Sequence, residues 1–175
     1  MSEPEHPRPI EIFIDADACP VKDEVYRVAG RYRLKTHVVA NAFMAIPVHP
    51  DIIRVVVEAG PDVADDWIAE HAAPGDVVIT SDIPLAERAL AVGAAVIAPN
   101  GRTFTRDSIG SAIAQRAIME QIRSTGGITG GPPPFGKLDR SRFLQALDEA
   151  IQSELRRRRR AKPVNPPVRG APSAL

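Results

Sequence analysis

Short runs of β-branched and other apolar residues recur along the first hundred residues, each bounded by Gly, Pro, Asn or Asp. Such runs are typical of buried strands. The predicted strands are residues 10–15, 36–40, 51–57, 76–80 and 94–98. Few polar positions interrupt them, which indicates a parallel sheet covered by helices on both faces.

Segments with helical spacing of apolar residues separate several of these strands. The predicted helices cover residues 22–33, 63–72 and 83–93, and Gly93 is a suitable helix end. Because strands and helices alternate, we expect an α/β domain with an open, three-layer parallel sheet.

Two further helices are predicted after Pro99. The first covers residues 108–124, capped by Asp107 or Ser108, and its apolar face is Ile109, Ile113, Ala117 and Met119. The second covers residues 138–159, and its apolar stripe is Phe143, Leu144, Leu147, Ile151 and Leu155. These are the additional C-terminal helices of the predicted fold.

The predicted domain is residues 10–155, between an N-terminal tail of residues 1–9 and a basic, Pro-rich, disordered tail of residues 156–175. Within the domain, the Gly/Pro segment 126–136 is either a flexible linker or an ordered loop over a site. In the second case Phe135 anchors the loop.

Charge is distributed unevenly along the 175 residues. Lys plus Arg and Asp plus Glu are 22 each, but residues 156–175 carry seven basic and no acidic side chains. The predicted domain is therefore acidic, which suits a cation better than unspecific binding of nucleic acid. The single Cys, and the lack of a signal sequence or a long apolar run, predict a cytoplasmic protein without a membrane segment.

Acidic residues follow three of the predicted strands, at the sheet edge where α/β proteins bind ligands. The residues at these strand ends are Asp15 and Asp17; Asp62, Asp65 and Asp66; and Thr80, Ser81 and Asp82. Close carboxylates repel one another, and a hard divalent cation such as Mg²⁺ or Mn²⁺ relieves that repulsion. Taken singly, Asp62 and Asp82 are equally suited to helix caps and Asp17 to a turn.

Other kinds of site have weaker support. An acidic neighbourhood makes Cys19 a poor nucleophile, and the four His residues lack zinc-site spacing. Neither a G-x-G-x-x-G nor a Walker sequence follows a strand, so neither NAD nor ATP is expected.

Five segments resemble the YaiI/YqxD family of uncharacterised bacterial proteins, a PIN-like group. They are IFIDADACPVKDEV, VVANAF, GPDVADDWIAEHAAPGDVVITSDIPLAERAL, APNGR and GGPPPFGKLDRSRFLQALD, and the resemblance covers residues 10–155. The order of their elements is similar to that of PIN and NYN domains, which are metal-dependent ribonuclease folds.

The resemblance implies phosphodiester hydrolysis, with RNA as the expected partner, in a Mg or Mn site. Asp15 would be the first metal carboxylate, Asp66 or Asp65 the middle one and Asp82 the last, with Ser81 beside it and Asp17 as a further ligand. The substrate-binding candidates are Lys22, Asn41, Arg102, Lys137 and Arg140. For the basic ones, a merely solvated surface cation is an equally good interpretation.

Two other functions stay open. A phosphatase of the haloacid dehalogenase type also has D-x-D after its first strand, but it needs a later Lys and then an acidic pair, and here ADD precedes TSD. The second alternative is a non-catalytic RNA-binding or regulatory module with the same fold.

Overall fold

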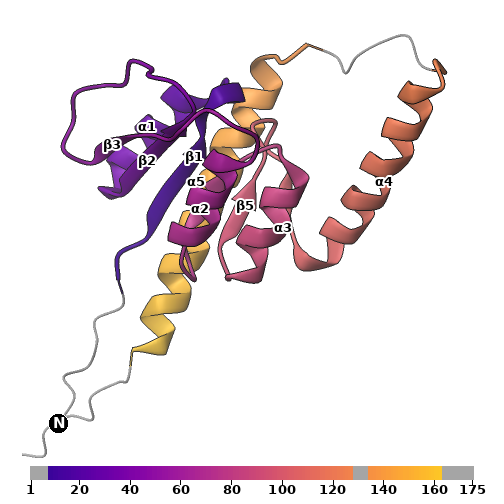
Figure 1. Cartoon of the computed structure of the whole chain (residues 1–175). Helices are drawn as coiled ribbons and strands as arrows, with labels where there is room; N and C mark the ends of the chain where they lie inside the picture. The colour runs from indigo at the N-terminus through magenta and orange to yellow at the C-terminus, as the bar shows by residue number, and fades with distance from the viewer. Residues whose placement is uncertain (1–7, 128–133, 163–175) are drawn as a thin grey trace, which may run out of the picture.

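The computed structural model describes residues 8–127 and 134–162, which form one six-stranded sheet with helices on both faces (Figure 1). The strands are β1 (Glu11–Asp15), β2 (Lys35–Ala40), β3 (Ile52–Val56), β4 (Val77–Ile79), β5 (Ala95–Ile97) and β6 (Thr103–Phe104). The five predicted strands are confirmed. The sixth, β6, has two residues and is too short to give a sequence pattern.

The strand order is β3-β2-β1-β4-β5-β6, and every neighbouring pair is parallel except β5 and β6. The sheet is therefore mixed rather than wholly parallel, because β6 returns antiparallel after a tight turn. The chain winds outward in both directions from β1 and β4. A crevice at such a reversal of strand order is where open α/β sheets bind ligands.

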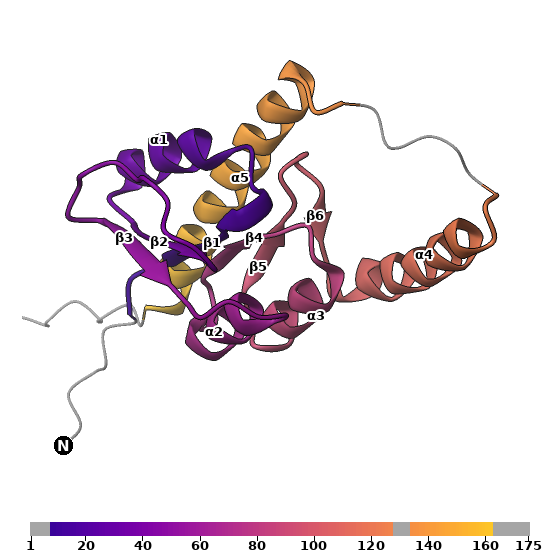
Figure 2. The same ribbon diagram turned by 45° about the horizontal axis from the view of Figure 1, so that its top comes forward.

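The helices form the two outer layers predicted for the fold (Figure 2). On one face lie α1 (Lys22–Tyr32) and α5 (Lys137–Ala161); on the other lie α2 (Val63–His71) and α3 (Ile83–Ala91), with α4 (Arg106–Ser124) packed on α3. A short 3-10 helix, η1 (Ala16–Ala18), follows β1 directly. Within the described ranges, no helix is long and apolar enough to cross a membrane.

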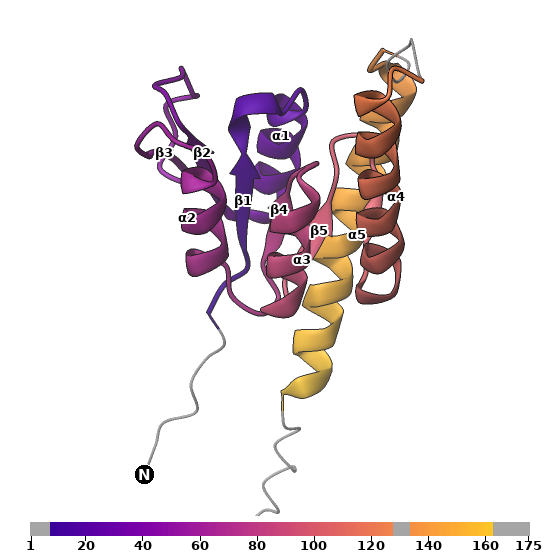
Figure 3. The same cartoon turned by 45° about the vertical axis from the view of Figure 1, so that its right-hand side comes forward.

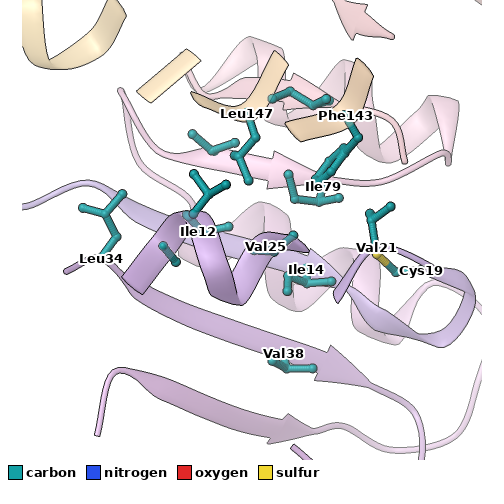
Figure 4. Close-up of a cluster of buried hydrophobic side chains, with 14 of the residues drawn as sticks. Ile12, Ile14, Cys19, Val21, Val25, Leu34, Val38, Ile79, Phe143 and Leu147 are labelled. Carbon is teal, nitrogen blue, oxygen red and sulfur yellow. The ribbon is translucent and has the colours of Figure 1, made fainter. Parts of the chain in front are cut away.

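Alternation along β1 divides the core into two clusters. Ile12 and Ile14 face α1 and α5 and are completely buried (Figure 4). From α5, the predicted stripe places Phe143 and Leu147 against them, also completely buried. Phe13, between the two isoleucines, belongs to the cluster under α2 and α3. Burying side chains on both faces fixes the register of the central strand.

Helix α4 differs from expectation in its cap and in its packing. Its N-cap is Thr105, whose hydroxyl accepts from the amide of Ser108 in a capping box, rather than Asp107 or Ser108. Of the predicted apolar face only Ile109 is buried, while Ile113 is 38% exposed. Figure 1 shows the reason, because beyond its first turns α4 stands apart from the body.

Helix α5 runs to Ala161, so Arg156–Arg160 are helical and the predicted boundary at residue 155 falls inside a helix. Glu154 accepts hydrogen bonds from Arg157 (2.6 Å) and Arg158 (2.7 Å). The rest of the predicted tail, residues 163–175, lies outside the described residues, as do residues 1–7 and 128–133. Phe135 packs against the α1/α5 core cluster, as the loop interpretation expects.

Candidate functional site

A cavity of about 580 Å³ opens at the carboxyl ends of β1 and β4, where the strand order reverses. We call it the acidic pocket. Its polar lining residues are Asp15, Asp17, Asn41, Asp62, Asp65, Ser81, Asp82 and Arg116. The pocket thus combines five carboxylates with one basic side chain, among the residues that the structure describes.

Three separate segments of the chain contribute these carboxylates. Strand β1 ends at Asp15, and η1 turns the chain so that Asp17 faces the same cavity. The first turn of α2 contributes Asp65, and the link from β4 to α3 contributes Asp82. Asp62, just before α2, has φ 65°, a left-handed conformation that is uncommon outside glycine. The backbone therefore turns tightly at Asp62, just before α2 begins.

Thr80 links Asp15 and Asp82 through its hydroxyl. Its buried hydroxyl donates to Asp15 Oδ2 (2.9 Å) and accepts from the backbone N–H of Asp82 (3.0 Å). Thr80 therefore fixes the orientation of the Asp15 carboxylate and the path of the chain at Asp82.

Asp82 also caps α3, because its Oδ1 accepts from the amide of Leu85 (2.9 Å). Asp82 is therefore a helix cap, as the structural interpretation predicts, and it also lines the acidic pocket. Asp15 and Asp82 each use one oxygen in these contacts. The second oxygen of each accepts no hydrogen bond from the described residues, so it is free to bind a ligand.

Mutual repulsion and burial disfavour negative charge in the acidic pocket. Burial raises the pKa of Asp15, and the charges of Asp82 and Asp17 raise it further, against the hydrogen bond from Thr80. The pKa of Asp65 rises to about 6, first through burial and then through the charges of Asp82 and Asp15. A cation in the pocket would reverse both shifts.

Asn41, at the end of β2, closes one side of the acidic pocket. Its backbone N–H donates to the carboxylate of Asp17, with N–O distances of 3.0 and 3.3 Å. Ser81 lines the pocket with an exposed side chain. Both residues lie where the sequence predicts them.

Of the two adjacent candidates on α2, the structure brings only Asp65 to the acidic pocket. Asp66 lies outside it and pairs with Arg88 of α3 at 2.6 Å on the surface. Consecutive helical residues point in directions about 100° apart, so one of the two must face away. Sequence spacing alone leaves this choice open.

The four basic substrate-binding candidates do not line the pocket. Lys22 Nζ donates to the carbonyl of Cys19 (2.7 Å), and Arg140 pairs with Glu24 (3.0 Å). Arg102 lies over the ring of Phe104 in the β5–β6 turn, and Lys137 is exposed at the start of α5. Each of these four side chains instead contacts residues outside the pocket or is exposed to solvent.

Arg116, of α4, is the basic residue of the pocket that sequence reasoning missed. Its Nε donates to Glu120 Oε1 at 3.1 Å, one turn along the same helix. A charged residue on a distant helix gives no sequence signal of its position. The sequence shows Thr80 and Asp62 in the polar runs that follow predicted strands, but only the fold shows which residues they contact.

Cys19 lies beside the acidic pocket but is buried, and burial raises the pKa of its thiol. This agrees with the expectation that it is a poor nucleophile.

The donors suit a hard cation in their chemistry, since they are carboxylate, amide and hydroxyl oxygens. In the described part of the chain, however, no three His, Cys, Asp or Glu side chains are grouped so as to hold a metal ion. Binding an ion would therefore require side-chain movement within the pocket. The free oxygens of Asp15 and Asp82 and the half-exposed Asp65 are the groups available for it.

Comparison with known proteins identifies relatives over most of the chain. A family model described as "Uncharacterized BCR, YaiI/YqxD family" matches residues 13–153. A protein named "UPF0178 protein" from Caulobacter sp. (strain K31) is 63% identical over 140 residues, covering 80% of this chain and 93% of the relative.

Two further relatives carry the same name. The protein from Azorhizobium caulinodans is 59% identical over 145 residues, covering 83% of this chain and 91% of its own length. That from Rhodopseudomonas palustris (strain BisB5) is 53% identical over 152 residues, covering 87% and 93%. A search of the solved structures gave no significant match. The resemblance seen in the five sequence segments is thus confirmed, and the chain belongs to the YaiI/YqxD family.

Proposed function

We propose that the acidic pocket binds Mg²⁺ or Mn²⁺ and that the protein hydrolyses phosphodiester bonds in RNA. The observation that carries this proposal is the meeting of Asp15, Asp65 and Asp82, from three separate segments, in one cavity at the strand-order reversal. The raised pKa values of Asp15 and Asp65 indicate an excess of negative charge that a bound cation would neutralise.

In this proposal Asp15 and Asp82 hold the ion through their free oxygens, with Asp65 and Asp17 as the remaining carboxylate donors. The bound ion would lower the pKa of water and stabilise negative charge on the leaving oxygen. Thr80 keeps Asp15 oriented. Arg116 is placed to contact a phosphate oxygen of the substrate from the α4 side.

The PIN-like fold inferred from the resemblance is part of this proposal. A phosphatase of the haloacid dehalogenase type has less support, because none of the described residues that line the pocket is a lysine.

The test incubates labelled single-stranded RNA and DNA with the protein in Mn²⁺, Mg²⁺ or EDTA. We expect cleavage of RNA that EDTA abolishes and that Asp15→Asn or Asp65→Asn lowers by more than about 100-fold. Asp66→Asn is the matched control, since Asp66 is adjacent to Asp65 but lies outside the pocket. It should cleave as the wild type does.

Three results would separate the alternatives. Equal loss in Asp65→Asn and Asp66→Asn would refute the assignment of the pocket. Cleavage in EDTA would refute the requirement for metal. RNA binding without turnover, in every metal, would favour the non-catalytic module over the enzyme.

A further inference from the structure

Phe43 exposes an aromatic ring beside the acidic pocket. It lies in the connection between β2 and β3, residues 41–51, and is 73% exposed. Its neighbours Met44 and Ile46 pack against the α1/α5 core cluster and anchor the connection. The exposure of Phe43 is therefore not the result of a loose loop, since the adjacent apolar side chains turn inward.

The guanidinium of Arg54, on the edge strand β3, packs against one face of this ring. Its guanidinium carbon lies 4.1 Å from the ring centroid, and its Nε donates to the carbonyl of Met44 at 2.8 Å. Among the described residues no carboxylate lies within ion-pair distance of Arg54. Phe43 and Arg54 thus form a fixed aromatic surface backed by an unneutralised positive charge.

The chain connects this pair directly to the acidic pocket. Asn41 lines the pocket and its backbone N–H donates to Asp17. Phe43 follows two residues later, so its Cα lies at most about 7 Å from that of Asn41. The connection that carries Phe43 therefore begins at the wall of the pocket, although neither Phe43 nor Arg54 lines the cavity itself.

We propose that Phe43 and Arg54 form a stacking site for an unpaired base of single-stranded nucleic acid whose backbone crosses the acidic pocket. The identity of this ligand rests on the proposed function. Unpaired bases stack on exposed aromatic rings and guanidinium planes, whereas paired bases in a duplex offer no free face. Arg54 adds attraction to the phosphates that the acidic pocket, without a cation, does not supply.

The test measures fluorescence anisotropy of a labelled oligouridine, the matched oligothymidine and an abasic oligomer with the same backbone, each in Mg²⁺ and in EDTA. We expect Phe43→Ala and Phe43→Leu to bind oligouridine about 5- to 100-fold more weakly, the range for loss of one base–aromatic stack. Phe43→Trp should bind at least as tightly as the wild type. Val48→Ala is the matched control, because Val48 is fully exposed in the same connection.

The abasic oligomer should show no difference between Phe43→Leu and the wild type. Wild-type affinity in Phe43→Leu, an equal loss on the abasic probe, or no binding of any single strand by the wild type would overturn the stacking site. Cleavage assayed in parallel keeps the two proposals apart. Base-dependent binding through Phe43 without hydrolysis would refute the nuclease alone, and hydrolysis together with wild-type affinity in Phe43→Leu would refute the stacking site alone.

Discussion

Thr80 has a buried hydroxyl that hydrogen-bonds to two residues of the acidic pocket, the Asp15 carboxylate and the backbone N–H of Asp82. Replacing it with Val keeps the shape but leaves the Asp15 carboxylate and the Asp82 N–H without their partner. We expect Thr80→Val to lower the free energy of unfolding by about 1–3 kcal/mol. The pKa of Asp15 should rise further, because the lost hydrogen bond stabilises its charged form.

Urea unfolding and an NMR titration of the Asp15 carboxyl measure the two effects. Thr80→Ser keeps the hydroxyl and should restore the pKa of Asp15 while leaving part of the loss in stability. An unchanged Asp15 pKa in Thr80→Val would contradict the role given to this hydrogen bond.

The raised pKa of Asp65 predicts how stability depends on pH without a divalent cation. The folded protein holds this proton up to about pH 6, while the unfolded chain releases it near pH 3.8, the usual pKa of an aspartate. Between these values the folded state binds more protons, so stability falls as pH rises through that window. Asp65→Asn removes this loss.

Melting curves in EDTA check this dependence. The gain in melting temperature of Asp65→Asn over the wild type should be larger at about pH 7.5 than at about pH 4.5. Asp66→Asn, on the surface, should show no such difference. A gain that is equal at both values would mean that Asp65 titrates normally.

At the residue scale, the sequence predicted which strand ends bring acidic residues into one cavity, because parallel strands present their carboxyl ends at one edge. It did not predict the choice of Asp65 over Asp66, which depends on the rotation of α2 about its axis. It also did not predict that Lys22 donates to the carbonyl of Cys19 in a local turn, or that Arg140 pairs with Glu24, a contact that comes from the packing of α5 on α1.

Helix α5 is fixed to the sheet at Gly101, in the β5–β6 turn. Gly101 has φ 88°, and a Cβ there would lie 2.6 Å from the backbone carbonyl carbon of Arg142. The turn and the helix therefore meet backbone to backbone. We expect Gly101→Ala to destabilise the protein by more than about 2 kcal/mol, through both the conformation and the clash.

Gly110 provides the contrast, because it lies within α4 and an added Cβ meets nothing within 4 Å. Gly110→Ala should raise the free energy of unfolding by about 0.5–1 kcal/mol, as alanine is the better helix former. Circular dichroism during urea unfolding measures both variants. A Gly101→Ala protein as stable as the wild type would show that the α5 contact at the turn is loose.

At the element scale, the strands, helices and layers were predictable because their apolar periodicity is strong. The exposure of α4 was not predictable, since its sequence has enough apolar residues for a buried face, and the structure buries only Ile109 and Ala112 near its start. The N-cap of α4 is Thr105 rather than Asp107 or Ser108, because the capping box satisfies more backbone amides than a single Asp would.

On the scale of the whole molecule, the arginine run lies far from the acidic pocket. Arg140 contacts residues at the start of α1, whereas Arg158 lies 18 residues further along α5, about 27 Å away. Figure 3 shows the end of α5 at the opposite end of the sheet from the tip of β1. The arginines are therefore suited to capturing a long strand at a distance, rather than to binding at the pocket.

Substituting Arg156, Arg159 and Arg160 with Gln tests this capture, and leaves the Glu154 pairs of Arg157 and Arg158 intact. The salt dependence of RNA affinity should become shallower by somewhat less than one unit for each lost phosphate contact. Turnover at saturating RNA should stay unchanged. An unaltered salt dependence of RNA affinity would indicate that the arginine run only increases solubility.

Helix α5 has one more consequence, for the order of events during synthesis. Ile12 and Ile14 of β1 are buried under Phe143 and Leu147, which are synthesised about 130 residues later in the chain. A nascent chain that ends before Lys137 already contains every aspartate of the acidic pocket but lacks half of the layer that covers β1. We therefore expect the pocket to assemble only after α5 has been synthesised, and a nascent chain that stops before it would carry the acidic residues without the helix that completes the cover of β1.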